Sequence, residues 1–474
     1  MVFPTLEFAA FFTLVFTMSW LLMPKPTWWK PFMLAASYAF YGYADWHFVF
    51  LLLGSTVFNQ AMAEVLYRVR PGRPRSVWTG VAVGGNLVVL GWFKYYGFFV
   101  ESVSSLLDQV HLGAPLPLLQ VALPVGISFF TFQALSYVID VQRGAIEPAT
   151  PIDFAVYLAF FPHLVAGPIV RASEFIPQLA RPRDPREVQA SRAFFLIAGG
   201  LVKKLVIADA LAGRLVDSVF NTPGQHSALE ILVGIYGYAV QIFCDFSAYS
   251  EMAIGIALLL GFQFPENFDA PYTATDLQDF WRRWHMSLSR WLRDYLYIPL
   301  GGNRGSPSRT YRNLMLTMLL GGLWHGAAWN FVIWGGIHGA GLALERRRSE
   351  HRIARGLPKP ADTLTHRIVG RVVTFHVVCL AWVFFRADGV GAAREILTRL
   401  VTAWGPAPLV TPTVLLLVAL GLAVQYLPRD ATQRLQHAFH GLGTAAQGVT
   451  LGVSLLLVDA LGNQGIAPFI YFRF

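Results

Sequence analysis

Long runs of apolar residues, separated by short polar segments, follow one another along almost the whole of this 474-residue chain. A helix needs roughly 20 apolar residues to cross the ~30 Å hydrocarbon core of a bilayer. The pattern therefore predicts an all-α, polytopic membrane protein with about ten spanning helices. We expect these helices at 5–23, 31–42, 48–67, 77–100, 119–140, 193–216, 229–261, 368–386, 411–427 and 447–461.

Two further apolar segments do not fit as simple crossings. Segment 153–170 is interrupted by Pro162 and Gly167. Segment 313–344 is too long for one crossing and too short for two. Irregular backbone at membrane depth is tolerated only against protein or a water-filled cavity. We therefore predict two re-entrant or broken segments around a central funnel, with His325 in its wall.

The composition agrees with a membrane protein, because 55% of the residues are hydrophobic and 14% are charged. Soluble domains average about 25% charged residues. No long polar block interrupts the chain, so we expect one integral-membrane domain over 1–474. The two cysteines, Cys244 and Cys379, both lie in apolar segments and lack the spacing of metal ligands.

The net charge of +9 does not indicate nucleic acid, because the basic residues gather in loops such as 68–75 and 345–371. Basic loops are typical of the cytoplasmic side and of contact with anionic membrane lipids. Loops without Lys or Arg are predicted to lie outside, as is Phe474. These loops are 101–118, 217–230 and 404–413.

Bulky apolar and basic residues share the stretch from Asp279 to Tyr295. Their spacing is helical, which predicts an amphipathic helix lying at the membrane surface. The apolar face would hold Trp281, Trp284, His285, Leu288, Trp291, Leu292 and Tyr295, with Arg282, Arg283, Arg290 and Arg293 on the remaining surface.

Standard catalytic and metal-binding motifs are absent from the sequence, so we expect no metal and no permanently bound cofactor. His325 lies between Trp324 and Gly326 in the middle of an apolar segment. Ionisable groups at membrane depth are costly and usually functional. His325 is therefore either a packed histidine that hydrogen-bonds the backbone or a general base. His285 has the same two interpretations.

Other ionisable residues occur inside apolar runs. On one continuous helix His338 would lie on roughly the opposite face from His325, so we expect it to serve packing. Asp245 needs a partner, for which an Arg or His of the central stretch is expected; its role is a structural ion pair or catalysis. Lys203 and Lys204 could meet such an acid or reach for the membrane surface.

With these residues assembled, the chain resembles the membrane-bound O-acyltransferase family, and most closely its bacterial branch of alginate O-acetyltransferases and teichoic acid D-alanyl transfer proteins. The run Pro299-Leu300-Gly301-Gly302-Asn303 favours the alginate type. The segments that carry the resemblance are 123–133, 161–169, 244–250, 267–272, 280–289, 297–303, 322–327 and 468–474.

The resemblance implies that His325 is catalytic and that His285 is the second histidine of the site. It implies helices in a ring around a funnel, where a cytoplasmic acyl thioester, such as acetyl-CoA as co-substrate, meets an acceptor from outside. The location would be the bacterial inner membrane. We expect substrate contacts from Trp324, Asp245, Tyr249, Trp281, Arg282, Arg283, Arg290 and Asn330.

The expected activity is acetyl transfer across the membrane for O-acetylation of an exported polysaccharide such as alginate. Peptidoglycan, teichoic acid and cellulose are alternative polymers. Because a hydrated polymer is costly to desolvate, we also expect an extracytoplasmic acetyltransferase partner that completes the transfer. A polysaccharide or lipid transporter would also use broken helices, but the sequence shows no internal repeat. A non-catalytic scaffold would leave His325 unexplained.

Overall fold

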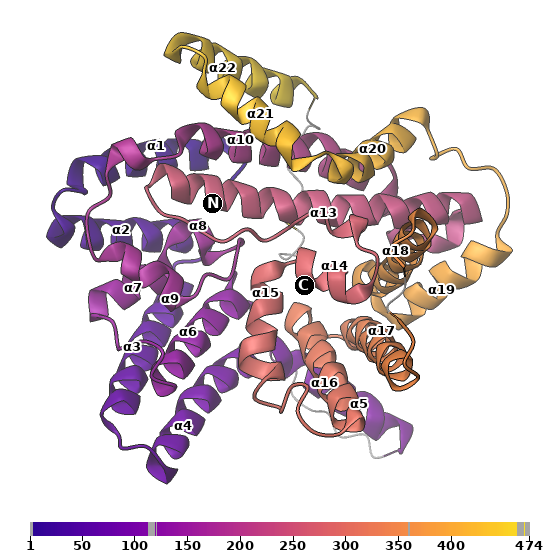
Figure 1. The fold of residues 1–474 in the computed structure, drawn as a ribbon, viewed down its shortest axis with the longest axis horizontal. Helices are drawn as coiled ribbons and strands as arrows, with labels where there is room; N and C mark the ends of the chain where they lie inside the picture. The colour runs from indigo at the N-terminus through magenta and orange to yellow at the C-terminus, as the bar shows by residue number, and fades with distance from the viewer. Residues whose placement is uncertain (1–2, 112–118, 120, 359–360, 462–468, 470–474) are drawn as a thin grey trace. The chain divides into compact units, whose positions relative to one another are not determined.

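In a computed structural model, the described residues are 3–111, 119, 121–358, 361–461 and 469, and these contain helices but no β-strand (Figure 1). The all-helical class predicted from the sequence is confirmed. The chain divides into two compact units, one of Met1–Ala190 with Ile256–Pro265 and one of Ser191–Gly255 with Glu266–Phe474. A single domain over 1–474 stays a prediction.

The first unit is built around α6, which is buried along nearly its whole length and packs against α3 and α4. Asn59 of α3 and Asn86 of α4 exchange buried amide hydrogen bonds of 3.1 and 2.7 Å, as polar side chains do between membrane helices. The helices are α1 (Leu6–Leu22), α2 (Pro26–Gly42), α3 (His47–Arg68), α4 (Arg73–Leu90), α5 (Tyr96–Gln109), α6 (Ile127–Gln142), α7 (Pro151–Ala159), α8 (Phe161–Leu164) and α9 (Ala172–Phe175).

The second unit is built around α13, whose 32 residues are apolar and mostly buried. Its helices are α10 (Ala190–Leu201), α11 (Asp209–Leu211), α12 (Asp217–Asn221), α13 (Ala228–Leu259), α14 (Leu277–Arg283), α15 (Met286–Leu292), α16 (Pro307–His325), α17 (Trp329–Ala354), α18 (Leu364–Arg386), α19 (Gly389–Thr402), α20 (Pro412–Ala423), α21 (Arg429–His440) and α22 (Thr444–Leu461), with π-helical turns at Val202–Ala208, Ala212–Val216 and Arg293–Tyr297.

Among the described residues, four helical segments are long and apolar enough to cross a membrane: His47–Arg68, Arg73–Gln109, Ala228–Leu259 and Leu364–Arg386. Shorter apolar helices occur at Leu6–Leu22, Pro412–Tyr426 and Ala445–Val458. Helices overlap the positions expected for the spans, but the helix expected at 119–140 begins only at Ile127, and the one expected at 77–100 belongs to a helical run over Arg73–Gln109. The number of crossings, about ten by sequence, stays a prediction, and Phe474 lies outside the described residues.

The continuous amphipathic helix predicted over 279–295 is wrong. α14 ends at Arg283, His285 adopts a left-handed backbone (φ 42°, ψ 55°), and a new helix, α15, begins at Met286. The break arises because Asn267 satisfies the first backbone N–H groups of α15: its carbonyl accepts from Met286 N at 2.9 Å and its side chain from Ser287 N at 3.1 Å. The seven residues predicted to form the apolar face are all buried.

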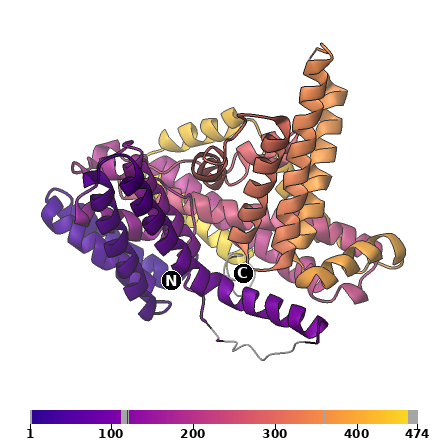
Figure 2. The same cartoon turned by 90° about the horizontal axis from the view of Figure 1, so that it is seen from below.

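Segment 313–344 is broken as expected, because α16 ends at His325 and α17 begins at Trp329. The two helices approach so closely that a Cβ on Gly322 would lie 2.1 Å from the Phe331 carbonyl oxygen, and one on Gly335 2.3 Å from that of Met318. α17 also packs along α18, and both helices are drawn in orange in Figure 2. Segment 153–170 is likewise broken, at Phe160. The re-entrant depth of both segments and the funnel stay predictions.

Candidate active site

His325 is the last residue of α16 and is buried, with 3% of its surface exposed. Three aromatic rings surround its imidazole. Their centroids lie 4.9 Å (Trp334), 5.0 Å (Trp324) and 5.2 Å (Phe385) from that of the histidine. This enclosure is apolar, so it would keep bulk water away from chemistry at the imidazole.

Trp324 lies between the two histidines singled out from the sequence. Its ring is 5.0 Å from that of His325 and 5.9 Å from that of His285. The break at Trp284 and His285 turns the His285 side chain toward this cluster, where its ring also meets Phe246 of α13 edge-on at 4.6 Å. Residues from α13, α16 and the break before α15 therefore converge on one candidate site in the second unit.

A hydrogen bond to Asn267 defines the tautomer of His285. The side-chain oxygen of Asn267 accepts from the backbone N–H of Ser287, so the atom facing His285 Nδ1 at 3.2 Å is an acceptor. Nδ1 therefore carries the proton, and Nε2 is the basic nitrogen of the neutral ring. The left-handed backbone at this fully buried histidine costs roughly 1 kcal/mol, which the surrounding contacts must offset.

Asp245 belongs to a buried ion cluster one helical turn before Tyr249. Lys204 Nζ lies 2.9 Å from Asp245 and 2.8 Å from Asp209, and all three side chains are at most 5% exposed. Asp245 thus pairs with Lys204, one of the two lysines considered as alternatives to an Arg or His partner. Lys203 forms a separate pair with Glu251. Asp209 was not singled out from the sequence.

The remaining expected site residues have varied surroundings. Tyr249 is buried and packs on Phe469 at 4.1 Å. Asn330 donates to the carbonyl of Ala387 at 2.7 Å, which ties the start of α17 to the end of α18. Trp281 Nε1 donates to Nδ1 of His338 at 3.3 Å.

His338 is fully buried and meets the same indole as His325 edge-on, with its ring 4.9 Å from that of Trp334. The prediction that His325 and His338 lie on opposite faces of one continuous helix is wrong. The helix breaks after His325, and the two histidines belong to α16 and α17. Trp334, which both rings contact, therefore joins the candidate site, and periodicity alone did not indicate it.

The three arginines expected to meet a substrate differ in exposure. Arg283 is held by Asp279 at 2.9 Å, whereas Arg282 is exposed and Arg290 is half-buried. Glu345 of α17 positions this part of the chain because its carboxylate accepts from the Leu277 and Gln278 N–H groups at the start of α14, at 2.8 and 3.3 Å. Burial raises the pKa of Glu345 from its ordinary value, and the Leu277 hydrogen bond opposes the rise.

Residues 84–385, which include both histidines of the site, match the sequence model of the membrane-bound O-acyltransferase family. The chain belongs to this family. It is therefore an enzyme, a membrane-bound O-acyltransferase, and a multi-pass membrane protein.

Individual relatives share sequence over most of their length. A probable alginate O-acetylase of Azotobacter vinelandii is 37% identical over 485 residues, which cover 93% of this chain and 94% of the relative. A probable alginate O-acetylase of Pseudomonas aeruginosa is 43% identical over 365 residues, 76% of this chain and 67% of the relative. A peptidoglycan O-acetyltransferase of Helicobacter pylori is 36% identical over 399 residues, 78% and 73% of the two chains.

Proposed function

We propose that this chain takes an acetyl group from a cytoplasmic thioester, acetyl-CoA in the simplest case, and delivers it across the bacterial inner membrane for O-acetylation of an exported polysaccharide. The observation that carries the proposal is the pair of buried histidines, His325 and His285, on either side of Trp324. The names of the relatives, which describe acyl transfer to alginate and peptidoglycan, support a polymer as the final acceptor.

In this proposal His325 acts as the general base. It accepts the proton of the acceptor hydroxyl while that oxygen attacks the thioester carbonyl, and the new C–O bond forms. Collapse of the tetrahedral intermediate breaks the C–S bond, and the departing thiolate takes the proton from the imidazolium. The rings of Trp324, Trp334 and Phe385 limit the access of water, which would otherwise hydrolyse the thioester.

His285 orients the donor. To stabilise the negative charge that develops on the thioester oxygen, the ring would also have to be protonated at Nε2, because its Nδ1–H is already bonded to Asn267. Its Nδ1–H is held by Asn267, so the ring is fixed before substrate arrives, and Nε2 is the nitrogen that would accept a hydrogen bond from substrate. Asn267 is accordingly a positioning residue. It also donates to Ser250 Oγ at 3.0 Å, which anchors it to α13.

Arg282 is the best of the three arginines for the phosphates of a donor such as acetyl-CoA. It is exposed, whereas Arg283 is already paired with Asp279. A guanidinium offers planar, permanently charged donors to a phosphate, and lipid head groups present the same chemistry.

Alginate is the first choice of polymer, because a relative described as a probable alginate O-acetylase aligns over 93% of this chain. Peptidoglycan is the second, on the strength of the Helicobacter pylori relative. We further propose that an extracytoplasmic partner protein receives the acetyl group and completes its transfer, because drawing a hydrated polymer into an apolar site would cost a large desolvation.

The test uses the purified chain in lipid nanodiscs with radiolabelled acetyl-CoA, the partner and polysaccharide. An acyltransferase releases free CoA and labels an acceptor. His325→Ala should abolish both, whereas His366→Ala, at an exposed histidine, should not. A transporter or a scaffold would release no CoA above the rate without protein, and that result would refute the proposal.

A further inference from the structure

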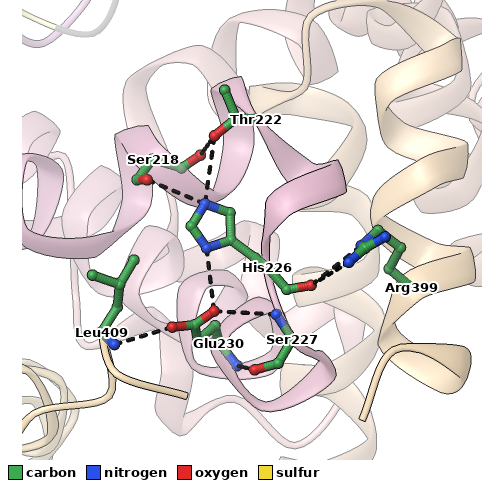
Figure 3. Close-up of polar contacts among 7 residues, drawn as sticks. All are labelled: Ser218, Thr222, His226, Ser227, Glu230, Arg399 and Leu409. Carbon is green, nitrogen blue, oxygen red and sulfur yellow. Dashed lines mark hydrogen bonds and ion pairs between the residues drawn. The ribbon is translucent and has the colours of Figure 1, made fainter. Parts of the chain in front are cut away.

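A second polar cluster lies between α12 and the start of α13, around His226, to which the sequence assigned no role. Figure 3 shows two hydroxyls, of Ser218 and Thr222, on one side of the imidazole and the Glu230 carboxylate on the other. His226 Nε2 lies 3.1 Å from Ser218 Oγ, and His226 Nδ1 lies 3.2 Å from Glu230 Oε2. The order hydroxyl, imidazole, carboxylate is that of a nucleophilic triad.

The direction of the protons follows from the chemistry of the three groups. An ionised carboxylate can only accept hydrogen bonds, so the Nδ1 that faces Glu230 carries the proton. In the neutral ring Nε2 is then the acceptor, and the hydroxyl of Ser218 donates to it. His226 is thus in the tautomer that can remove the proton of Ser218.

The acid and the histidine are held by the backbone around them. Glu230 accepts from the N–H of Ser227 at 3.1 Å and from that of Leu409 at 3.0 Å, and the first of these belongs to a capping box at the start of α13. Arg399 donates to the His226 carbonyl at 3.0 and 3.2 Å. With 3% and 7% of their surfaces exposed, Glu230 and His226 are buried and oriented in advance.

Ser218 is the better nucleophile of the two hydroxyls. The hydroxyl oxygen of Thr222 lies 3.5 Å from His226 Nε2, and this hydroxyl donates a hydrogen bond to the Ser218 carbonyl at 3.0 Å. Ser218 is exposed as a residue and its hydrogen bond to His226 is partly buried, so it lies at the edge of the cluster while the histidine and the acid are buried.

The cluster adjoins the site of His325 through the end of α18. Phe385 packs on His325, and the next residue, Arg386, forms a 2.7 Å ion pair with Asp217, the neighbour of Ser218. Segment 217–230 contains no Lys or Arg and is predicted to face outward. Ser218 would therefore meet acyl groups on the side where the acceptor of the transfer arrives.

We propose that Ser218, His226 and Glu230 form a second acyl-transfer site that accepts short-chain acyl esters or thioesters. Ser218 Oγ attacks the acyl carbonyl while His226 takes its proton; the new ester C–O bond forms, the bond to the leaving group breaks, and the leaving group departs with the proton. A hydroxyl of the acceptor, or water, then releases the acyl group by the reverse sequence. The choice of acetyl as the acyl group and the arrival of the acceptor on this side rest on the proposed function.

The experiment supplies p-nitrophenyl acetate to the purified full-length chain and measures p-nitrophenolate release together with acetylated peptides by mass spectrometry. The expected result is acetyl-Ser218 in the wild type, none at this position in Ser218→Ala, and acylation slower by about a hundredfold or more in His226→Gln. Glu230→Gln should lower kcat with little change in KM, measured on the folded fraction because the new amide N–H group would face a backbone donor. Thr222→Ala, the matched exposed hydroxyl, should retain acylation.

His325→Ala should also retain acylation of Ser218 while losing acetyl-CoA-dependent transfer, so that the two sites are tested separately. Equal acetylation of Ser218 in the wild type and in folded His226→Gln would overturn the inference and leave the cluster as a link between α12, α13 and the segment at Leu409. Failure of transfer from acetyl-CoA with normal acylation of Ser218 would refute the proposed function alone. Ser218→Cys, which keeps a nucleophile, should be acetylated more slowly when combined with His226→Gln; an equal rate would likewise count against the triad.

Discussion

Replacing Lys204 by Met should destabilise the protein strongly, because Lys204 is the cation between Asp209 and Asp245. The side chains are at most 5% exposed and the two N–O distances are 2.8 and 2.9 Å. Removing one partner of a buried ion pair typically costs about 3–5 kcal/mol, since it leaves a charge without its counter-ion at low dielectric. The ratio of folded to unfolded protein should fall by about a hundredfold to a few thousandfold.

The measurement is thermal unfolding of purified protein in detergent, followed by tryptophan fluorescence and by monodisperse recovery on size exclusion. Lys203→Met is the matched control, because the neighbouring lysine pairs with Glu251 at a more exposed position and should have a smaller effect. Adding Asp209→Asn and Asp245→Asn to Lys204→Met should recover much of the loss, because neutral amides no longer need the cation. A triple variant no more stable than Lys204→Met would refute the reasoning from buried charge.

Three further predictions concern chemistry, topology and the partner. His325→Ala should reduce acetyl transfer by about a hundredfold to ten-thousandfold at unchanged expression and unfolding temperature, whereas activity that falls only with the amount of folded protein would indicate packing; His285→Ala should lose comparable activity with more loss of stability. Impermeant thiol reagents should label Arg70→Cys only from the cytoplasmic side and Gly405→Cys only from outside. Labelling of both positions from the same side would contradict the topology. The chain alone should transfer little acetate from acetyl-CoA to free polysaccharide, and its extracytoplasmic partner should restore transfer; efficient transfer without the partner would show that the sugar itself reaches the site.

The apolar pattern was a good guide to where helices form and which face is buried. Trp281, Trp284 and His285 are all buried as expected, because burial of an apolar face is determined by local periodicity. The break before Met286 was missed, since it depends on hydrogen bonds that Met286 and Ser287 donate to Asn267, about 20 residues earlier and outside any helical period.

The candidate site was predicted only in part for the same reason. Trp324 and His325 are neighbours in sequence, so their proximity was evident. The place of His285 beside Trp324 depends on the left-handed turn, and no periodic pattern indicates such a turn. For Asp245 an Arg or His of the central stretch was expected, whereas Lys204 pairs with it, because a charge inside an apolar run shows that a counter-ion is needed but not which of several it is.

The glycine contacts between α16 and α17 have a consequence for changing the acyl group. Backbone lies against backbone at Gly322 and Gly335, so any larger side chain there would shift the register of the two helices. The helical hairpin α16–α17, which carries His325, is therefore closely packed and cannot separate to admit a longer acyl chain. Space beside the imidazole of His325 has to come from side chains on other helices. Phe385 of α18 is the first residue to replace by a smaller one in an enzyme intended for larger acyl donors.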